Sequence, residues 1–140
     1  MNLDLSGKTA IVCGSTQGIG KATALQLAKM GANIVLVARN EVKLASVKDE
    51  LDISKGQKHN YIITDFNLPA ELKLRVEAFI KENGPAHILV NNTGGPPGGQ
   101  AIGAKTDEYT SAFNMHLISN QCLAQALVEG MKSEGYGRII

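Results

Sequence analysis

The sequence predicts an α/β fold: a doubly wound parallel sheet with helices on both faces, truncated after the start of a fifth strand. Two observations predict it. Short, continuous apolar runs alternate with amphipathic segments along the whole chain, and such runs are typical of parallel strands buried on both faces. A glycine-rich segment, 13–20, directly follows the first apolar run. Alternating strands and helices joined by right-handed crossovers form a doubly wound sheet, which binds ligands beyond the carboxyl ends of its strands.

The individual elements follow from local patterns. Strands are expected at the apolar runs 8–14, 33–39, 59–65, 87–92 and 137–140. Helices are expected at 18–30, 41–53, 68–84 and from about 107 to 131. Gly31 and Gly84 end the first and third helices, and Pro69 lies near the start of the third, which is the favoured placement of these two residue types.

Composition limits the function classes. The chain has 140 residues, 44% of them hydrophobic and 19% charged, with a net charge of +1, so we expect one domain with a substantial core and no affinity for nucleic acid or an anionic membrane. No apolar stretch suits a bilayer, and residues 1–8 lack the features of a secretory signal, which favours a cytoplasmic protein. Cys13 and Cys122 lack metal-ligand spacing, so we expect buried thiols and no metal site.

The glycine-rich segment is the first candidate site. A loop between a strand and a helix presents free N–H groups and the positive end of a helix dipole, which suits a pyrophosphate. Gly14 would permit the turn, Gly18 would let the backbone approach phosphate, and Gly20 would let the helix pack closely on the sheet. A tight turn without any ligand remains the alternative interpretation.

The end of the second strand indicates which dinucleotide fits. A cofactor with a free ribose 2′-hydroxyl usually meets an acid about 20 residues after the loop, whereas this chain has Ala38 and Arg39 there. An arginine suits a 2′-phosphate, and the hydroxyls of Ser15 and Thr16 are nearby donors. NADP(H) is therefore favoured, with NAD(H) as the second choice; a solvated arginine at a strand end is the simpler alternative.

Four motifs in register resemble the short-chain dehydrogenase/reductase family. "CGSTQGIG" (13–20) resembles its T-G-x3-G-x-G loop with Cys13 in place of Thr, and "NNTG" (91–94) resembles N-N-A-G with Thr93 in place of Ala. "TD" (64–65) matches the third-strand Asp, and "GRII" (137–140) matches the G-R-I-V of strand five. The resemblance covers the whole chain, is strongest for the 3-oxoacyl reductase branch, and implies a Rossmann fold.

The resemblance also implies an activity and a set of binding residues. The family transfers a hydride between NADP(H) or NAD(H) and a small carbonyl or alcohol substrate, and we expect a homodimer or homotetramer. Asp65 inherits contact with the adenine amino group. The implied cofactor-binding residues are Gly14, Ser15, Thr16, Gln17, Gly18, Ile19, Gly20, Arg39, Asp65, Phe66, Asn91, Asn92, Thr93 and Gly94.

The family's catalytic Ser, Tyr and Lys have no counterpart here. They belong beyond residue 140, so we expect residues 1–140 to be a single-domain fragment of a longer chain, inactive by itself. Tyr109 and Tyr136 lie in the wrong places to replace the catalytic Tyr. The alternative is a non-catalytic NADP(H)-binding relative that acts as a sensor or structural partner.

His116 occupies the position of the family's fourth catalytic residue, an Asn that holds a water in the proton relay. It interrupts an apolar stripe that runs through Tyr109, Phe113, Leu117 and onward to Met131. A relay residue and a hydrogen-bonded core histidine are both consistent with this pattern. The Gly- and Pro-rich loop 93–100, with two stiffening prolines at 96–97, is expected to form a wall of the substrate pocket.

Overall fold

A computed structural model describes residues 3–95 and 98–140 of the chain. Within them, five parallel strands form one sheet in the order β3-β2-β1-β4-β5, which confirms the predicted fold. The strands are β1 (Thr9–Cys13), β2 (Asn33–Ala38), β3 (Asn60–Ile63), β4 (Ile88–Val90) and β5 (Arg138–Ile139). Because β1 pairs with both β2 and β4, the chain reverses its direction of winding beside β1.

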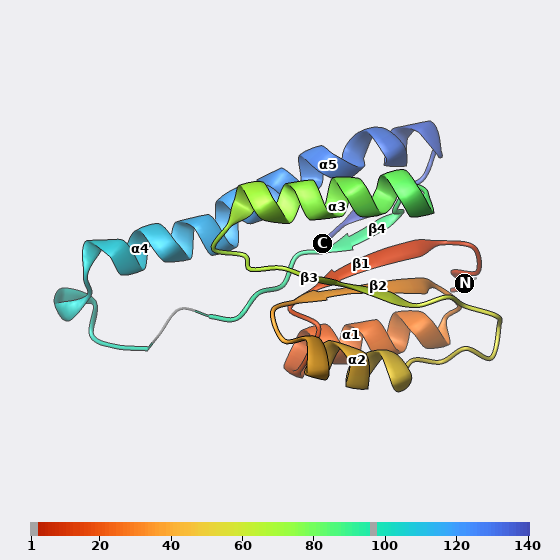
Figure 1. Cartoon of the computed structure of the whole chain (residues 1–140), viewed down its shortest axis with the longest axis horizontal. Coiled ribbons are helices and arrows are strands. Elements are labelled where there is room, and N and C mark those ends of the chain that lie inside the picture. The colour runs from red at the N-terminus through yellow and green to blue at the C-terminus, as the bar shows by residue number, and fades with distance from the viewer. Residues whose placement is uncertain (1–2, 96–97) are drawn as a thin grey trace.

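Helices cover both faces of the sheet (Figure 1). On one face lie α1 (Gly18–Lys29) and α2 (Glu41–Asp49), and on the other lie α3 (Pro69–Asn83) and α5 (Ser119–Ser133). α2 ends four residues before the predicted boundary at 53. None of the helices in the described ranges has the length and apolar character needed to cross a bilayer.

The alternation of side chains in β1 builds two cores. Ala10 and Val12 belong to the core under α1 and α2, whereas Ile11 and Cys13 belong to the core under α3 and α5. All four side chains are fully buried. Since successive side chains of a strand point to opposite faces, a strand covered on both faces must be apolar at every position, which is the pattern that predicted it.

The predicted single helix from about 107 to 131 is three segments. It consists of α4 (Thr106–Phe113), a π-helical turn η2 (Asn114–Ile118) and α5, and it is preceded by a 3-10 turn η1 (Ala101–Gly103). A π turn adds one residue to a helical turn and so changes which side chains face the sheet after it.

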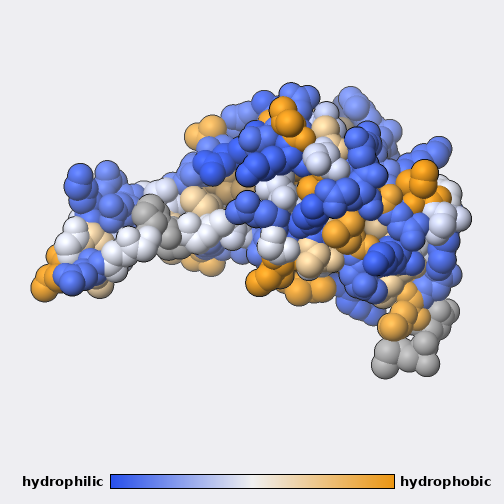
Figure 2. Space-filling model, turned by 90° about the horizontal axis from the view of Figure 1, so that it is seen from below, coloured by the Kyte–Doolittle hydropathy of each residue, from blue (hydrophilic) through white to orange (hydrophobic). Residues whose placement is uncertain are grey.

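The first half of the predicted apolar stripe is wrong, because its side chains are exposed. Tyr109, Phe113 and Leu117 are 59%, 54% and 53% exposed. The reason is tertiary: α4 projects away from the layered body, so the sheet offers these side chains no surface to pack on (Figures 1 and 2). The buried side of α5 consists of Ser119, Leu123, Leu127 and Met131.

Candidate functional site

The candidate site is a pocket of about 470 Å³ at the carboxyl ends of the strands. It lies where the chain reverses its winding beside β1, as expected for a doubly wound sheet. Its residues come from the segments that follow β1, β2, β3 and β4. They are Gly14, Thr16, Gln17, Gly18, Ile19, Ala38, Arg39, Asn40, Lys43, Phe66, Asn92, Thr93 and Gly94.

Each glycine of the loop is required for a different reason. Gly14 has φ +57°, and a Cβ there would lie 2.5 Å from the Asn92 carbonyl oxygen. A Cβ on Gly20 would collide with the Gly14 carbonyl oxygen and lie 2.7 Å from Asn92 Nδ2, so α1 packs closely on the loop. Gly18 has φ +55° and no atom within 4 Å of its Cβ position. It lines the pocket, so its missing side chain leaves room for a ligand instead of a neighbour.

Two side chains fasten the loop to the sheet. Asn92 Nδ2 donates to the carbonyl oxygens of Cys13, at 3.3 Å, and Gly14, at 3.2 Å, which joins the loops after β4 and β1. Ser15 is fully buried, and its Oγ accepts from the Val37 N–H at 3.1 Å. The Ser15 hydroxyl thus contacts β2, and its predicted role as a donor to the cofactor stays a prediction.

Positive charge gathers where β2 ends. Arg39 and Lys43 both line the pocket, and the Arg39 side chain is 71% exposed. Asn40, between them in sequence, caps α2 by accepting from the Lys43 N–H at 2.9 Å. Asn40 and Lys43 were not predicted as site residues. The signal was available, because Asn is a favoured N-cap and Lys43 follows three residues later, in the first turn.

Three predicted cofactor residues besides Ser15 lie outside the pocket lining: Gly20, Asp65 and Asn91. Asp65 Oδ1 accepts from the Asn67 N–H at 2.9 Å, and its Oδ2 lies 3.8 Å from Arg39 Nη1. The Asn91 N–H donates to the Ile140 carbonyl at 2.7 Å. The predicted contact of Asp65 with adenine stays a prediction, as does the role of Asn91.

His116 reaches the pocket through Thr93. Its Nδ1 lies 2.6 Å from Thr93 Oγ1, in hydrogen-bond contact, and Thr93 lines the pocket whereas His116 does not. His116 sits in the middle of the π turn. Its Nε2 is buried without a hydrogen-bond partner among the described residues. The prolines at 96–97, predicted to stiffen the pocket wall, lie outside the described residues.

Cys13, at the start of the glycine loop, is not a reactive group. Complete burial raises the pKa of its thiol to about 12, although a hydrogen bond involving Asn92 opposes this. A thiolate is the reactive form of cysteine, so Cys13 serves the core as a small apolar side chain, as predicted. Cys122 is only partly buried, so the expectation of two buried thiols is wrong for Cys122.

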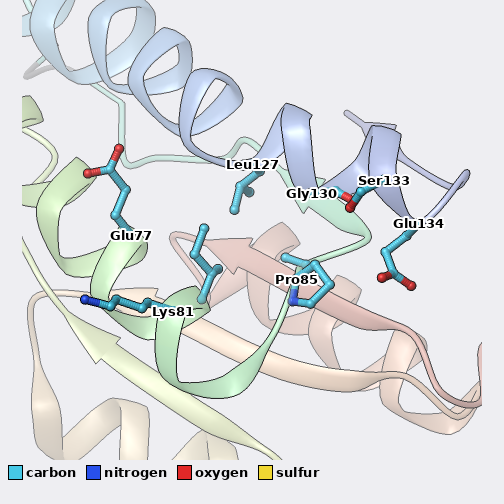
Figure 3. A pocket seen from close by; sticks show the side chains of 9 residues that line it. Glu77, Lys81, Pro85, Leu127, Gly130, Ser133 and Glu134 are labelled. Atoms are coloured by element: carbon cyan, nitrogen blue, oxygen red, sulfur yellow. The ribbon is translucent and has the colours of Figure 1, made fainter.

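A second hollow of about 450 Å³ lies between α3 and α5 (Figure 3). Its lining residues are Glu77, Ile80, Lys81, Pro85, Ala86, Leu127, Gly130, Ser133 and Glu134. It lies next to the residues that enter β4, at the opposite end of the sheet from the glycine loop. Its charged lining residues are two carboxylates, Glu77 and Glu134, and one cation, Lys81. This excess of negative charge disfavours a phosphate, so the pocket beside Gly18 is the candidate site.

A family model described as "short chain dehydrogenase" matches residues 8–140. The chain belongs to the short-chain dehydrogenase/reductase family. The match spans the glycine loop, Arg39, Thr93 and His116, and it agrees with the motifs found in the sequence.

Individual members of the family are similar over the whole chain. It is 32% identical to 3-oxoacyl-[acyl-carrier-protein] reductase FabG of Rickettsia bellii over 99% of this chain and 54% of that protein. It is 34% identical to the uncharacterized oxidoreductase YvaG of Bacillus subtilis over 100% of this chain and 52% of that protein. The chain thus spans about half the length of these curated relatives.

A solved structure shows the same likeness. L-sorbose reductase from Gluconobacter frateurii, complexed with NADPH and L-sorbose, superposes with a TM-score of 0.90 at 34% identity, over 99% of this chain and 53% of that one. A TM-score of 0.90 over 99% of this chain means that the two proteins share the fold that positions the pocket.

Proposed function

We propose that the protein is an NADP(H)-dependent oxidoreductase that transfers a hydride between the nicotinamide and a small carbonyl or alcohol substrate. One observation carries the choice of NADP(H). Arg39 and Lys43 both line the described part of the pocket, and no Asp or Glu does. Asp65 Oδ2 lies 3.8 Å from Arg39 Nη1 but outside the lining. Two cations in the lining suit a ribose 2′-phosphate, and the lining lacks the acid that usually meets the free 2′-hydroxyl of NAD(H).

The described residues fit this cofactor. The backbone of residues 14–20 would hold the pyrophosphate, because no side chain at Gly18 blocks its approach and the space around that position is open. Arg39 and Lys43 would hold the 2′-phosphate, Asp65 and Phe66 the adenine, and the segment 91–94 the nicotinamide side. The NADPH complex of the similar L-sorbose reductase supports this assignment. When bound, NADPH supplies the hydride.

The chain's own residues supply positioning and proton movement. We assign the proton donor and its tuning groups, the family's Ser, Tyr and Lys, to the protein beyond residue 140. Residues 1–140 would then form the cofactor-binding domain, without turnover of their own. His116, joined to the pocket through Thr93, would take part in the proton relay. A homodimer or homotetramer is the expected assembly, and light scattering after gel filtration measures it.

Calorimetry on the full-length protein tests the cofactor assignment. NADPH should bind with a much lower Kd than NADH. Arg39→Ala should weaken NADPH binding by about 1.5–3 kcal/mol, the range for a hydrogen bond to a charged group, which is roughly 12- to 160-fold in Kd. NADH binding should hardly change. Arg75→Ala is the control, because Arg75 is an exposed arginine on α3 that forms an ion pair with Glu71 and lies outside the pocket lining.

Two outcomes would reject parts of the proposal. Equal affinity of the wild type for NADPH and NADH would refute the role of Arg39 and Lys43. A wild type that binds NADPH tightly but reduces none of a broad panel of ketones, 3-oxoacyl thioesters and keto sugars would favour the non-catalytic sensor or structural partner.

A further inference from the structure

The three histidines of the chain differ in the group that their Nδ1 atom contacts. His59 Nδ1 accepts from the Ile34 N–H at 3.0 Å, and His87 Nδ1 accepts from the Thr9 N–H at 3.0 Å. A backbone N–H can only donate, so Nδ1 of each neutral ring must be unprotonated and Nε2 must carry the proton. The fold therefore fixes the tautomer of His59 and of His87.

His116 lacks such a constraint. Its Nδ1 partner is the Thr93 hydroxyl, at 2.6 Å, and a hydroxyl can donate or accept because it rotates. Its Nε2 is buried with no hydrogen-bond partner in the described part of the chain. Neither ring nitrogen meets a group that can only donate or only accept, so the direction of the Thr93 hydrogen bond decides which tautomer is present.

Thr93 connects this ring to the pocket. Thr93 lines the pocket, whereas His116 is not part of the lining, so a ligand in the pocket meets Thr93 and not the imidazole ring. The ring sits in the π turn, a distortion that is frequent at functional sites.

We propose that Thr93 and His116 form a tautomer switch set by occupancy of the pocket. Without a ligand, the Thr93 hydroxyl donates to Nδ1 and Nε2 carries the proton. When the Thr93 hydroxyl donates its hydrogen bond to an acceptor oxygen of bound NADP(H), Oγ accepts a hydrogen bond from Nδ1–H instead. One proton leaves Nε2 for solvent and one from solvent reaches Nδ1, so the charge of the ring is unchanged.

The switch makes Nε2 a proton acceptor only in the loaded protein. Thr93 keeps its own proton throughout, because its hydroxyl donates a hydrogen bond to the ligand while its oxygen accepts one from Nδ1–H. Thr93 is the positioning residue in this scheme, since it acts through the ring. The inference rests on the proposed function, because it requires NADP(H) in the pocket.

The test is nitrogen-15 NMR of the full-length protein labelled at histidine, which distinguishes protonated from unprotonated ring nitrogens. His59 and His87 are internal references whose tautomer should not change. We expect the major tautomer of His116 to change from Nε2–H to Nδ1–H on saturation with NADPH. Thr93→Ser, which keeps the hydroxyl, should behave like wild type. Thr93→Val, which keeps the shape, should lose the change.

Two results would overturn the switch: an unchanged His116 tautomer in protein that calorimetry shows to be saturated with NADPH, or the same change in Thr93→Val. If NADPH does not bind at all, the proposed function fails separately. The ligand-free spectra then decide the matter, because identical His116 tautomer populations in wild type and Thr93→Val would show that Thr93 does not control the ring.

Discussion

The glycine loop offers a test that separates packing from ligand binding within three residues. A Cβ on Gly20 would collide with the Gly14 carbonyl oxygen, which is backbone and cannot rotate away. Gly20→Ala should therefore destabilise the protein by about 2–3 kcal/mol, the upper part of the range for overpacking. At about 2–4 °C per kcal/mol, Tm should fall by roughly 4–12 °C.

Gly18→Val should act on the cofactor instead. Its side chain would enter open space within the pocket, so the structural cost is limited to φ +55°, about 1–2 kcal/mol for a residue with a side chain. By blocking the approach of the pyrophosphate to the backbone, the valine should raise the Kd of NADPH at least about 100-fold, equivalent to two lost charged hydrogen bonds.

Gly56→Val is the matched control. Gly56 also has a positive φ, +78°, and nothing within 4 Å of its Cβ position, but it lies outside the pocket lining. It should lose similar stability and bind NADPH normally. Differential scanning fluorimetry and calorimetry on the full-length protein measure both quantities. A folded Gly18→Val protein with wild-type affinity would show that the loop is only a tight turn.

Three further predictions concern named side chains. Because burial raises the pKa of Cys13 to about 12, iodoacetamide should label Cys122 in the native protein and Cys13 only after unfolding, as mass spectrometry would show. Burial and the neighbouring Lys8 lower the pKa of His87 from 6.5 despite the opposing Glu134. The unfolded chain therefore protonates the His87 imidazole more readily than the folded protein does, so stability should fall as pH drops below about 6.5. His87→Asn should flatten that part of the Tm–pH curve. His116→Ala should lower kcat about 100-fold with little effect on NADPH affinity, and His116→Asn should recover much of it; a kcat unchanged in both, with lowered Tm, would mark a core histidine.

Sequence by itself determined the parts of this protein that depend on local pattern. Continuous apolar runs that alternate with amphipathic segments predicted a doubly wound parallel sheet covered on both faces, and the structure confirms it. Gly14, Gly18 and Arg39 follow the ends of β1 and β2 and line the pocket, because the carboxyl ends of parallel strands border the binding crevice.

Tertiary structure decided what depends on contacts between distant segments. The side chain of Asn92 meets Cys13 across 79 positions, and Thr93 meets His116 across 23. Helical periodicity placed Tyr109 and Phe113 in the core, yet both are exposed because α4 extends past the sheet. The sequence shows that Ser15 has a hydroxyl, but only the fold shows that this hydroxyl accepts from the Val37 N–H. A pattern along the chain records which face of an element is apolar, whereas the partner that a polar group meets is set by which other segment the fold brings within about 3 Å.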